Sequence, residues 1–145
     1  MTAALAEAAK ALLAGEVPVG AVVVAGERIL ARGRNRMIGR SDPTAHAEVD
    51  AIRRAARRAG NYRLAGCDLY VTIEPCAMCV GAAVQARIRR LVYGAADPKA
   101  GAVRSVVAFP FDKLNHRIET KGGVRSEDCG RLLRNFFKAR RKRPR

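Results

Sequence analysis

A predicted strand that leads straight into a predicted helix constrains the fold of this chain more than any other feature. Residues 68–74 are rich in β-branched and aromatic side chains, which is typical of a strand. Pro75 follows at once, and proline is favoured at the first position of a helix, which we expect to continue to Gln85. Because a strand and the helix after it bury apolar faces against other elements, this order predicts a sheet covered by helices.

The rest of the chain repeats the alternation of strands and helices. Residues 26–27 are expected to form a turn between two strands, Gly15 to end the first helix, and Thr44 and Ser126 to act as N-caps. The alternation predicts an α/β sandwich with a mixed sheet. The other predicted strands cover residues 18–25, 28–34 and 91–94, and the other predicted helices cover residues 2–14, 44–59 and 127–140.

The length of 145 residues suits one domain, which at this size needs no disulfides to fold. We expect a single domain over residues 1–140 and a basic, disordered tail over residues 141–145. In the two helices with the clearest periodicity, the expected buried stripes are Val49, Ile52, Ala56 and Ala59, and Leu133, Phe136 and Phe137. The cluster Arg53, Arg54, Arg57 and Arg58 is expected to form a solvated helix face.

The chain is strongly basic, with a formal net charge of +15. Six cations lie in the last eight residues, so the body of the chain retains +9 without them. A surplus of this size favours a polyanionic partner, most simply a nucleic acid. Solubility and attraction to an anionic membrane are the alternative explanations.

No apolar run is long enough to span a membrane, because the longest one, residues 17–26, has ten residues. The alanine-rich start has no basic segment before it, so we interpret it as a helix rather than a signal peptide. We therefore expect a cytoplasmic protein without a membrane partner, in which cysteines are reduced. Cys67, Cys129 and His116 are expected to be structural.

Two short motifs carry the chemistry. His46 and Glu48 lie near the start of one predicted helix, and Cys76 and Cys79 at the start of another. A helix N-terminus lowers the pKa of a cysteine, so both sulfurs are expected to bind metal as thiolates. One histidine and two thiolates suit Zn²⁺ and leave a fourth position open, as in catalytic sites, where Glu48 would move protons.

A structural zinc module that binds RNA without catalysis is the competing interpretation. It would need a fourth protein ligand, for which Cys67 and Cys129 are the candidates. Glu48 argues against it, because a closed metal site has no use for a carboxylate beside the metal.

A His-x-Glu motif followed by Pro-Cys-x-x-Cys is the signature of zinc deaminases. The chain resembles the tRNA-specific adenosine deaminase family of the cytidine/deoxycytidylate deaminase superfamily. The resemblance implies a cytidine-deaminase-like three-layer α/β/α sandwich, one zinc ion per chain, a homodimer, and a tRNA anticodon stem-loop as substrate. It also implies conversion of adenosine to inosine at the wobble position. The segments that carry the resemblance are residues 16–24, 35–48, 69–79, 94–102, 114–117 and 132–141.

The resemblance implies a role for individual residues. Glu48 would be the catalytic proton carrier, and Asn35 and the Ala47 backbone N–H would hydrogen-bond the flipped base. Unlike many members of the family, this chain has no His-Pro pair before Leu114, and we expect it to be without the family's aromatic-containing N-terminal extension. The implied metal ligands are His46, Cys76 and Cys79, and the implied substrate contacts are Asn35, Val17, Ala47, Pro75, Asp97, Lys99 and Asn115.

The zinc motifs alone do not select the substrate. Adenine, guanine and cytosine all carry an amino group on a ring carbon, so a deaminase of a free base or nucleoside, such as guanine or cytidine, is the alternative enzyme. The positive charge and the segments after Gly94 favour RNA. Because the residues around them are strongly basic, the sequence leaves open that one of Phe136 and Phe137 faces RNA instead of the core.

Overall fold

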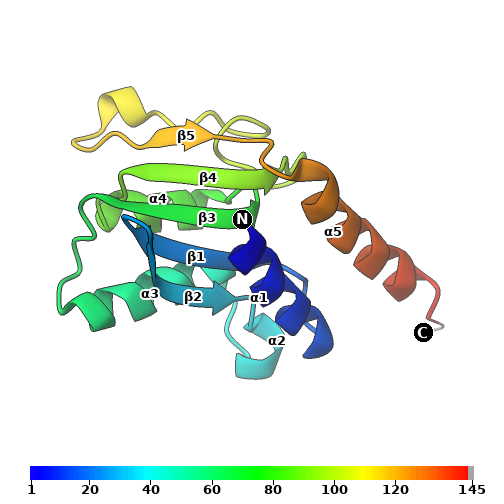
Figure 1. Ribbon diagram of the computed structural model, residues 1–145. Helices are drawn as coiled ribbons and strands as arrows, with labels where there is room; N and C mark the ends of the chain where they lie inside the picture. The colour runs from blue at the N-terminus through cyan, green and yellow to red at the C-terminus, as the bar shows by residue number, and fades with distance from the viewer. Residues whose placement is uncertain (144–145) are drawn as a thin grey trace.

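The computed structural model describes residues 1–143 and contains a five-stranded sheet with helices on both of its faces (Figure 1). Each predicted strand and helix is present, with ends that differ by up to three residues. Two helices and one strand were not predicted: α2, the 3₁₀ helix η1 and β5. The elements are α1 (Thr2–Leu13), β1 (Gly20–Ala25), β2 (Arg28–Arg34), α2 (Met37–Arg40), α3 (Ala47–Ala59), β3 (Cys67–Ile73), α4 (Ala77–Gln85), β4 (Arg90–Ala95), η1 (Phe111–Lys113), β5 (Glu119–Lys121) and α5 (Ser126–Arg141).

The strand order in the sheet is β2-β1-β3-β4-β5. Strand β1 pairs antiparallel with both β2 and β3, whereas β3, β4 and β5 run parallel to one another. This arrangement confirms the predicted mixed sheet. Parallel neighbours require a crossover connection, and α4 provides it between β3 and β4.

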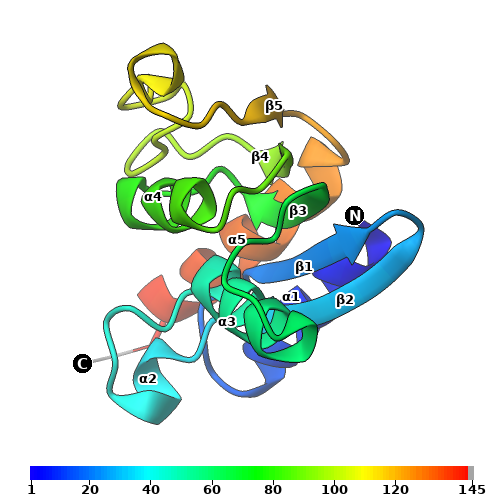
Figure 2. The same ribbon diagram turned by 90° about the vertical axis from the view of Figure 1, so that its left-hand side faces the viewer.

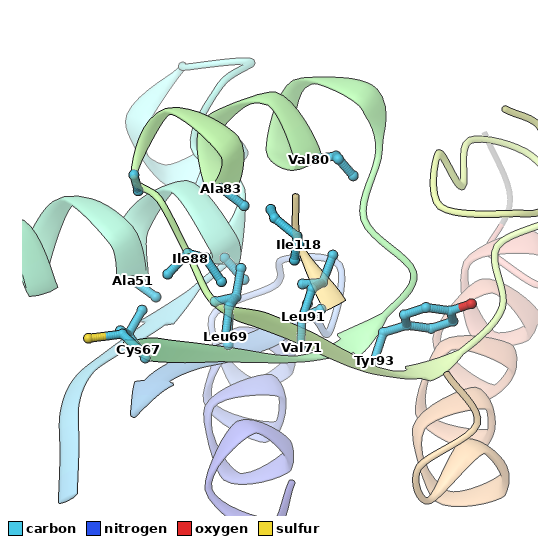
Figure 3. Packing of buried hydrophobic residues seen from close by; sticks show 14 of the residues in the cluster. Ala51, Cys67, Leu69, Val71, Val80, Ala83, Ile88, Leu91, Tyr93 and Ile118 are labelled. Carbon is cyan, nitrogen blue, oxygen red and sulfur yellow. The ribbon is translucent and has the colours of Figure 1, made fainter. Parts of the chain in front are cut away.

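The helices form a layer on each face of the sheet, which confirms the three-layer α/β/α sandwich. Helix α1 lies in front of the sheet in Figure 1 and α3 and α4 lie behind it, while α5 packs beside α1 against β3 and β4. Figure 2 shows the two layers separated by the strands. Between β3, β4 and α4, the side chains of Leu69, Val71, Leu91, Val80 and Ala83 form a continuous apolar core (Figure 3).

The packing of α3 on β2 corrects the predicted apolar stripe of that helix. Its buried alanines are Ala47, Ala51 and Ala55, whereas Ala56 is half-buried and Ala59 is exposed. A Cβ atom at Gly33 of β2 would overlap the backbone of α3, so the helix approaches the strand more closely than any larger residue would allow. Small residues on both sides therefore define this interface. The neighbouring cluster Arg53, Arg54, Arg57 and Arg58 is exposed, as predicted.

The two helices that carry the motifs begin later than the sequence predicts. Helix α3 has His46 as its N-cap, and Thr44 instead donates from its hydroxyl to Asp42 Oδ1 at 2.7 Å. Helix α4 has Cys76 as its N-cap, so Pro75 precedes the helix rather than opening it. Both N-cap residues have an extended backbone, and neither side chain makes a capping hydrogen bond.

The two aromatic residues of helix α5 differ in burial. Phe136 is buried, as predicted, whereas Phe137 is 47% exposed, so only the first of the two belongs to the core. The helix continues to Arg141, the first residue of the predicted tail, and Pro144 and Arg145 lie outside the described residues. Within residues 1–143, no helix combines the length and the apolar character needed to cross a membrane.

Candidate active site

Three metal-ligating side chains meet where the N-termini of α3 and α4 approach each other. His46 Nδ1 lies 3.7 Å from Cys76 Sγ and 3.5 Å from Cys79 Sγ. In a tetrahedral zinc site with ordinary bond lengths, a nitrogen and a sulfur ligand are about 3.6 Å apart. The three ligand atoms lie within 4.8 Å of one another, and the two nitrogen–sulfur distances match those of a tetrahedral zinc site.

The surroundings of Cys76 and Cys79 shift the pKa values of their thiols. Hydrogen bonds from Cys79 and His46 lower the pKa of Cys76 to about 4, so its sulfur is a thiolate at neutral pH. The Cys79 thiol donates to that thiolate, and this hydrogen bond together with burial raises the pKa of Cys79. A metal ion that displaces the remaining proton would bind two thiolates and one imidazole, which is a donor set typical of zinc.

The group of ligands contains no fourth protein side chain among residues 1–143. Cys67 is buried at the start of β3 and Cys129 in α5, as expected of structural cysteines. His116 is held by a 2.7 Å contact between its Nε2 and the Ile88 carbonyl oxygen. Three ligands leave one tetrahedral position open, as in catalytic zinc sites, and the closed structural site considered above has no support.

Glu48 lies in the first turn of α3, two residues after His46, and is only 3% exposed. Burial raises the pKa of its carboxyl group, since the charged form loses its hydration. A carboxyl group with a raised pKa is suited to take up a proton and release it again near neutral pH.

A cavity of about 800 Å³ opens in front of these residues, large enough for a nucleoside. Its wall contains His46, Glu48 and Cys76, together with four of the substrate contacts that the resemblance implies: Val17, Asn35, Asp97 and Lys99. Residues from distant parts of the sequence thus surround one space beside the metal ligands.

The structure places the other three implied contacts elsewhere. Ala47 and Pro75 are buried directly beside the metal ligands but do not form part of the cavity wall. The Ala47 N–H donates to Asn35 Oδ1 at 2.9 Å, which uses the backbone donor that the resemblance assigned to the base. Asn115 is exposed in the loop after η1 and does not line the cavity.

Two parts of the cavity wall were missed by the sequence analysis. One is Glu74, whose position before the Pro-Cys motif was interpreted only as the end of a strand. The other is a set of side chains on α5, which we call the α5 wall. It consists of Arg134, Phe137, Lys138 and Arg141. The spacing of these four residues by three or four positions placed them on one helix face, but only the docking of α5 shows that this face meets the metal motifs.

A family model of MafB19-like deaminases matches residues 1–141. The fold, the open group of three metal ligands and the buried glutamate beside it therefore define a deaminase of the cytidine-deaminase-like fold.

Comparison with known proteins shows to which family of deaminases the chain is similar in sequence and structure. The chain is 51% identical to the tRNA-specific adenosine deaminase of Haemophilus influenzae over 139 residues, which are 94% of this chain and 79% of the relative. It is 47% identical, with a TM-score of 0.88, to a structure from a study of A-to-I editing by tRNA:A34 deaminases at the wobble position, covering 92% of this chain and 97% of the other. The chain belongs to the tRNA-specific adenosine deaminases.

The same fold also carries a different substrate specificity. Guanine deaminase from Nitrosomonas europaea is 25% identical, with a TM-score of 0.78, over 92% of this chain and 80% of its own. The identity to this guanine deaminase is about half of the identity to the structure from the study of tRNA:A34 deaminases.

Proposed function

We propose that this protein binds one zinc ion per chain and converts adenosine to inosine at the wobble position of a tRNA anticodon by hydrolytic deamination. The observation that carries the proposal is the group of His46, Cys76 and Cys79 beside a cavity that Glu48 lines together with His46 and Cys76. Membership in the tRNA-specific adenosine deaminases supplies the substrate class.

The reaction replaces the exocyclic amine at adenine C6 with oxygen from water and releases ammonia. Zinc held by His46, Cys76 and Cys79 would acidify a water at its open position. The Glu48 carboxylate takes the proton from the attacking water and delivers it to adenine N1. It then transfers the second proton to the amine, the C6–N bond breaks, and Glu48 returns to its ionised form.

Asn35 orients the base for this reaction. Its Oδ1 already accepts the hydrogen bond from Ala47, so its Nδ2 amide is the group left to donate to a purine acceptor. Val17 contributes an apolar surface to the cavity, against which the base can pack. The target base must be unstacked to enter, which costs least in a single-stranded anticodon loop.

The α5 wall and Lys99 support an RNA substrate. Lys99, Arg134, Lys138 and Arg141 place four cations in the wall of the cavity, where they could bind the phosphates on either side of the target nucleotide. Free adenosine has no phosphate and would make no use of them. We also propose, from the family, that Asp97 and Asn115 contact neighbouring nucleotides and that the protein acts as a cytoplasmic homodimer.

The experiment that tests this function measures inosine in an anticodon stem-loop incubated with the purified protein. Free adenosine, guanine and cytidine serve as competing substrates at the same salt concentration. We expect efficient inosine formation in the stem-loop and poor turnover of the three free compounds. Efficient deamination of a free compound without inosine in the RNA would overturn the tRNA assignment and leave the zinc chemistry intact.

A further inference from the structure

Glu74 is a buried carboxylate in the cavity wall that the proposed reaction does not use. It directly follows β3, precedes the metal motif by two residues, and is 1% exposed. A buried carboxylate without hydrogen-bonding partners is costly, so its contacts indicate what it does.

Within residues 1–143, the hydrogen bonds to this carboxylate all come from one loop segment. Glu74 Oε2 accepts backbone N–H groups of Val103 (3.3 Å), Arg104 (3.3 Å) and Ser105 (3.1 Å). Glu74 Oε1 accepts the Ser105 hydroxyl at 2.6 Å. Three of the four donors bond Oε2 and one bonds Oε1, so both oxygens of this carboxylate are engaged in holding the loop.

The segment of residues 96–105, which we call the wall loop, packs against Glu74. It contains no helix or strand that would fix its position. A Cβ atom at Gly101 would overlap the Glu74 carboxylate, so the loop backbone passes directly over that group. The Ala102 N–H donates to the Pro75 carbonyl oxygen at 2.8 Å, which attaches the loop to the residue just before the first metal-ligating cysteine.

The wall loop carries two of the implied substrate contacts that line the cavity, Asp97 and Lys99. Asp97 Oδ1 accepts the backbone N–H groups of Lys99 (2.9 Å) and Ala100 (3.2 Å), which closes the tip of the loop. The Gly101 N–H donates to the Asp97 carbonyl oxygen at 2.9 Å, which joins this tip to the part held by Glu74. The position of the tip therefore depends on the anchor beneath it.

We infer that Glu74 is a positioning residue that fixes the wall loop on the metal motif and thereby holds Asp97 and Lys99 in place for the nucleotides beside the target base. The inference rests on the proposed function for the nature of the substrate. The anchoring itself does not depend on it, because it concerns contacts within the chain.

The anchoring is tested first by backbone amide hydrogen exchange in the zinc-loaded protein. Glu74→Gln replaces one acceptor oxygen with an amide that cannot accept, so exchange at residues 101–105 should rise at least about tenfold. Exchange in β1 and β3 should change much less, and one zinc per chain should remain. Unchanged exchange at residues 101–105, an equal rise throughout the sheet, or loss of zinc would overturn the inference.

The effect on the substrate is tested by kinetics with the anticodon stem-loop. Glu74→Gln should raise KM about tenfold or more while kcat stays within about twofold, because binding contacts are displaced and Glu48 is not. Glu7→Gln is the matched control: Glu7 is a buried carboxylate of α1 that contacts Lys10 and Arg34 and lies outside the cavity wall. Its KM should equal that of the unmodified chain. A fall in kcat at unchanged KM for Glu74→Gln would overturn the inference.

A second variant reaches the same contact from the loop. Gly101→Ala forces the loop away from Glu74, so it should raise exchange and KM in the same way. In the double variant Glu74→Gln/Gly101→Ala, exchange and KM should rise no further than in either single variant, because both substitutions break the same contact between Glu74 and the wall loop. Additive effects would show two independent defects and refute the proposed coupling. Ser105→Ala removes only the hydroxyl contact and should show a weaker form of the same changes. It replaces Glu74→Gln in these experiments if that variant does not fold.

The outcomes for the proposed function and for this inference are distinguishable. If the unmodified protein forms no inosine in RNA, the proposed function fails, whereas the exchange experiment still decides the role of Glu74.

Discussion

The side chain of Asn35 and the backbone of Ala47 form a buried hydrogen bond of 2.9 Å, in which the Ala47 N–H donates to Asn35 Oδ1. It joins the end of β2 to the first residue of α3 and therefore places the Asn35 amide beside His46 and Glu48. One side chain thus fixes the start of the motif helix and presents a donor to the cavity.

This double role predicts that two substitutions of Asn35 differ. Asn35→Asp keeps the acceptor for Ala47 but removes the amide donor, so it should lose turnover by about tenfold or more. Asn35→Ala removes both groups and should also lower the free energy of unfolding by about 1–3 kcal/mol, since the Ala47 N–H is left buried without a partner. Urea unfolding and stem-loop turnover distinguish the two variants. Full turnover in Asn35→Asp would contradict the assigned contact with the base.

The metal ligands predict a selective loss of zinc. Cys76→Ala and Cys79→Ala should each lose bound zinc and all activity, since two remaining ligands hold the ion poorly. Cys129→Ala is the matched control, because Cys129 is a buried cysteine of α5 outside the group of ligands. It should keep one zinc per chain. Metal analysis of the purified variants decides the matter, and undiminished zinc in both ligand variants would refute the site.

Glu48 is predicted to act in catalysis and not in metal binding. Glu48→Gln should keep zinc, fold and RNA binding and should reduce kcat by about 10⁴ or more, at the upper end for a general acid–base group because it carries several protons. Glu119→Gln changes an exposed carboxylate of β5 and serves as the control. Loss of zinc from Glu48→Gln would instead indicate that Glu48 is a ligand, and near-normal turnover would exclude the mechanism.

The α5 wall predicts where the charge of this chain acts on RNA. Lys138→Gln/Arg141→Gln should weaken binding to the stem-loop and flatten the dependence of log K on log salt by about 0.7 for each phosphate that the protein no longer neutralises. Arg53→Gln/Arg57→Gln removes the same charge from the exposed face of α3, away from the cavity, and should leave the slope nearly unchanged. Equal effects of the two pairs would mean that only the net charge matters.

The space around two glycines, Gly33 of β2 and Gly81 of α4, predicts opposite effects of their substitution on stability. Gly33→Ala should destabilise the protein by about 3 kcal/mol or more, because the new methyl group overlaps the backbone of α3. Gly81→Ala in α4 meets no atom within 4 Å and should stabilise the protein by about 0.5–1 kcal/mol through helix propensity. Denaturant unfolding of the two variants measures both effects, and a neutral Gly33→Ala would contradict the observed packing.

Several features of the site could be predicted from the sequence because they depend on residue type and local spacing. A Cys-x-x-Cys pair at a helix start and a histidine two residues before a glutamate restrict the metal, the open position and the proton carrier without any knowledge of packing. Short apolar runs and turn residues likewise defined the four longer strands. Strand β5 was not predicted because its three residues, Glu119–Lys121, are polar or charged and show no apolar pattern.

The tertiary structure decided which remote segments share the cavity. Periodicity placed Phe136 and Phe137 on one helix, but only the docking of α5 against β3 and β4 buries the first and turns the second toward the metal motif. Glu74 could be interpreted locally as the end of a strand, whereas its partners lie about thirty residues later in the wall loop. Such contacts depend on packing between elements far apart along the chain, and neither residue type nor local spacing encodes which of them will meet.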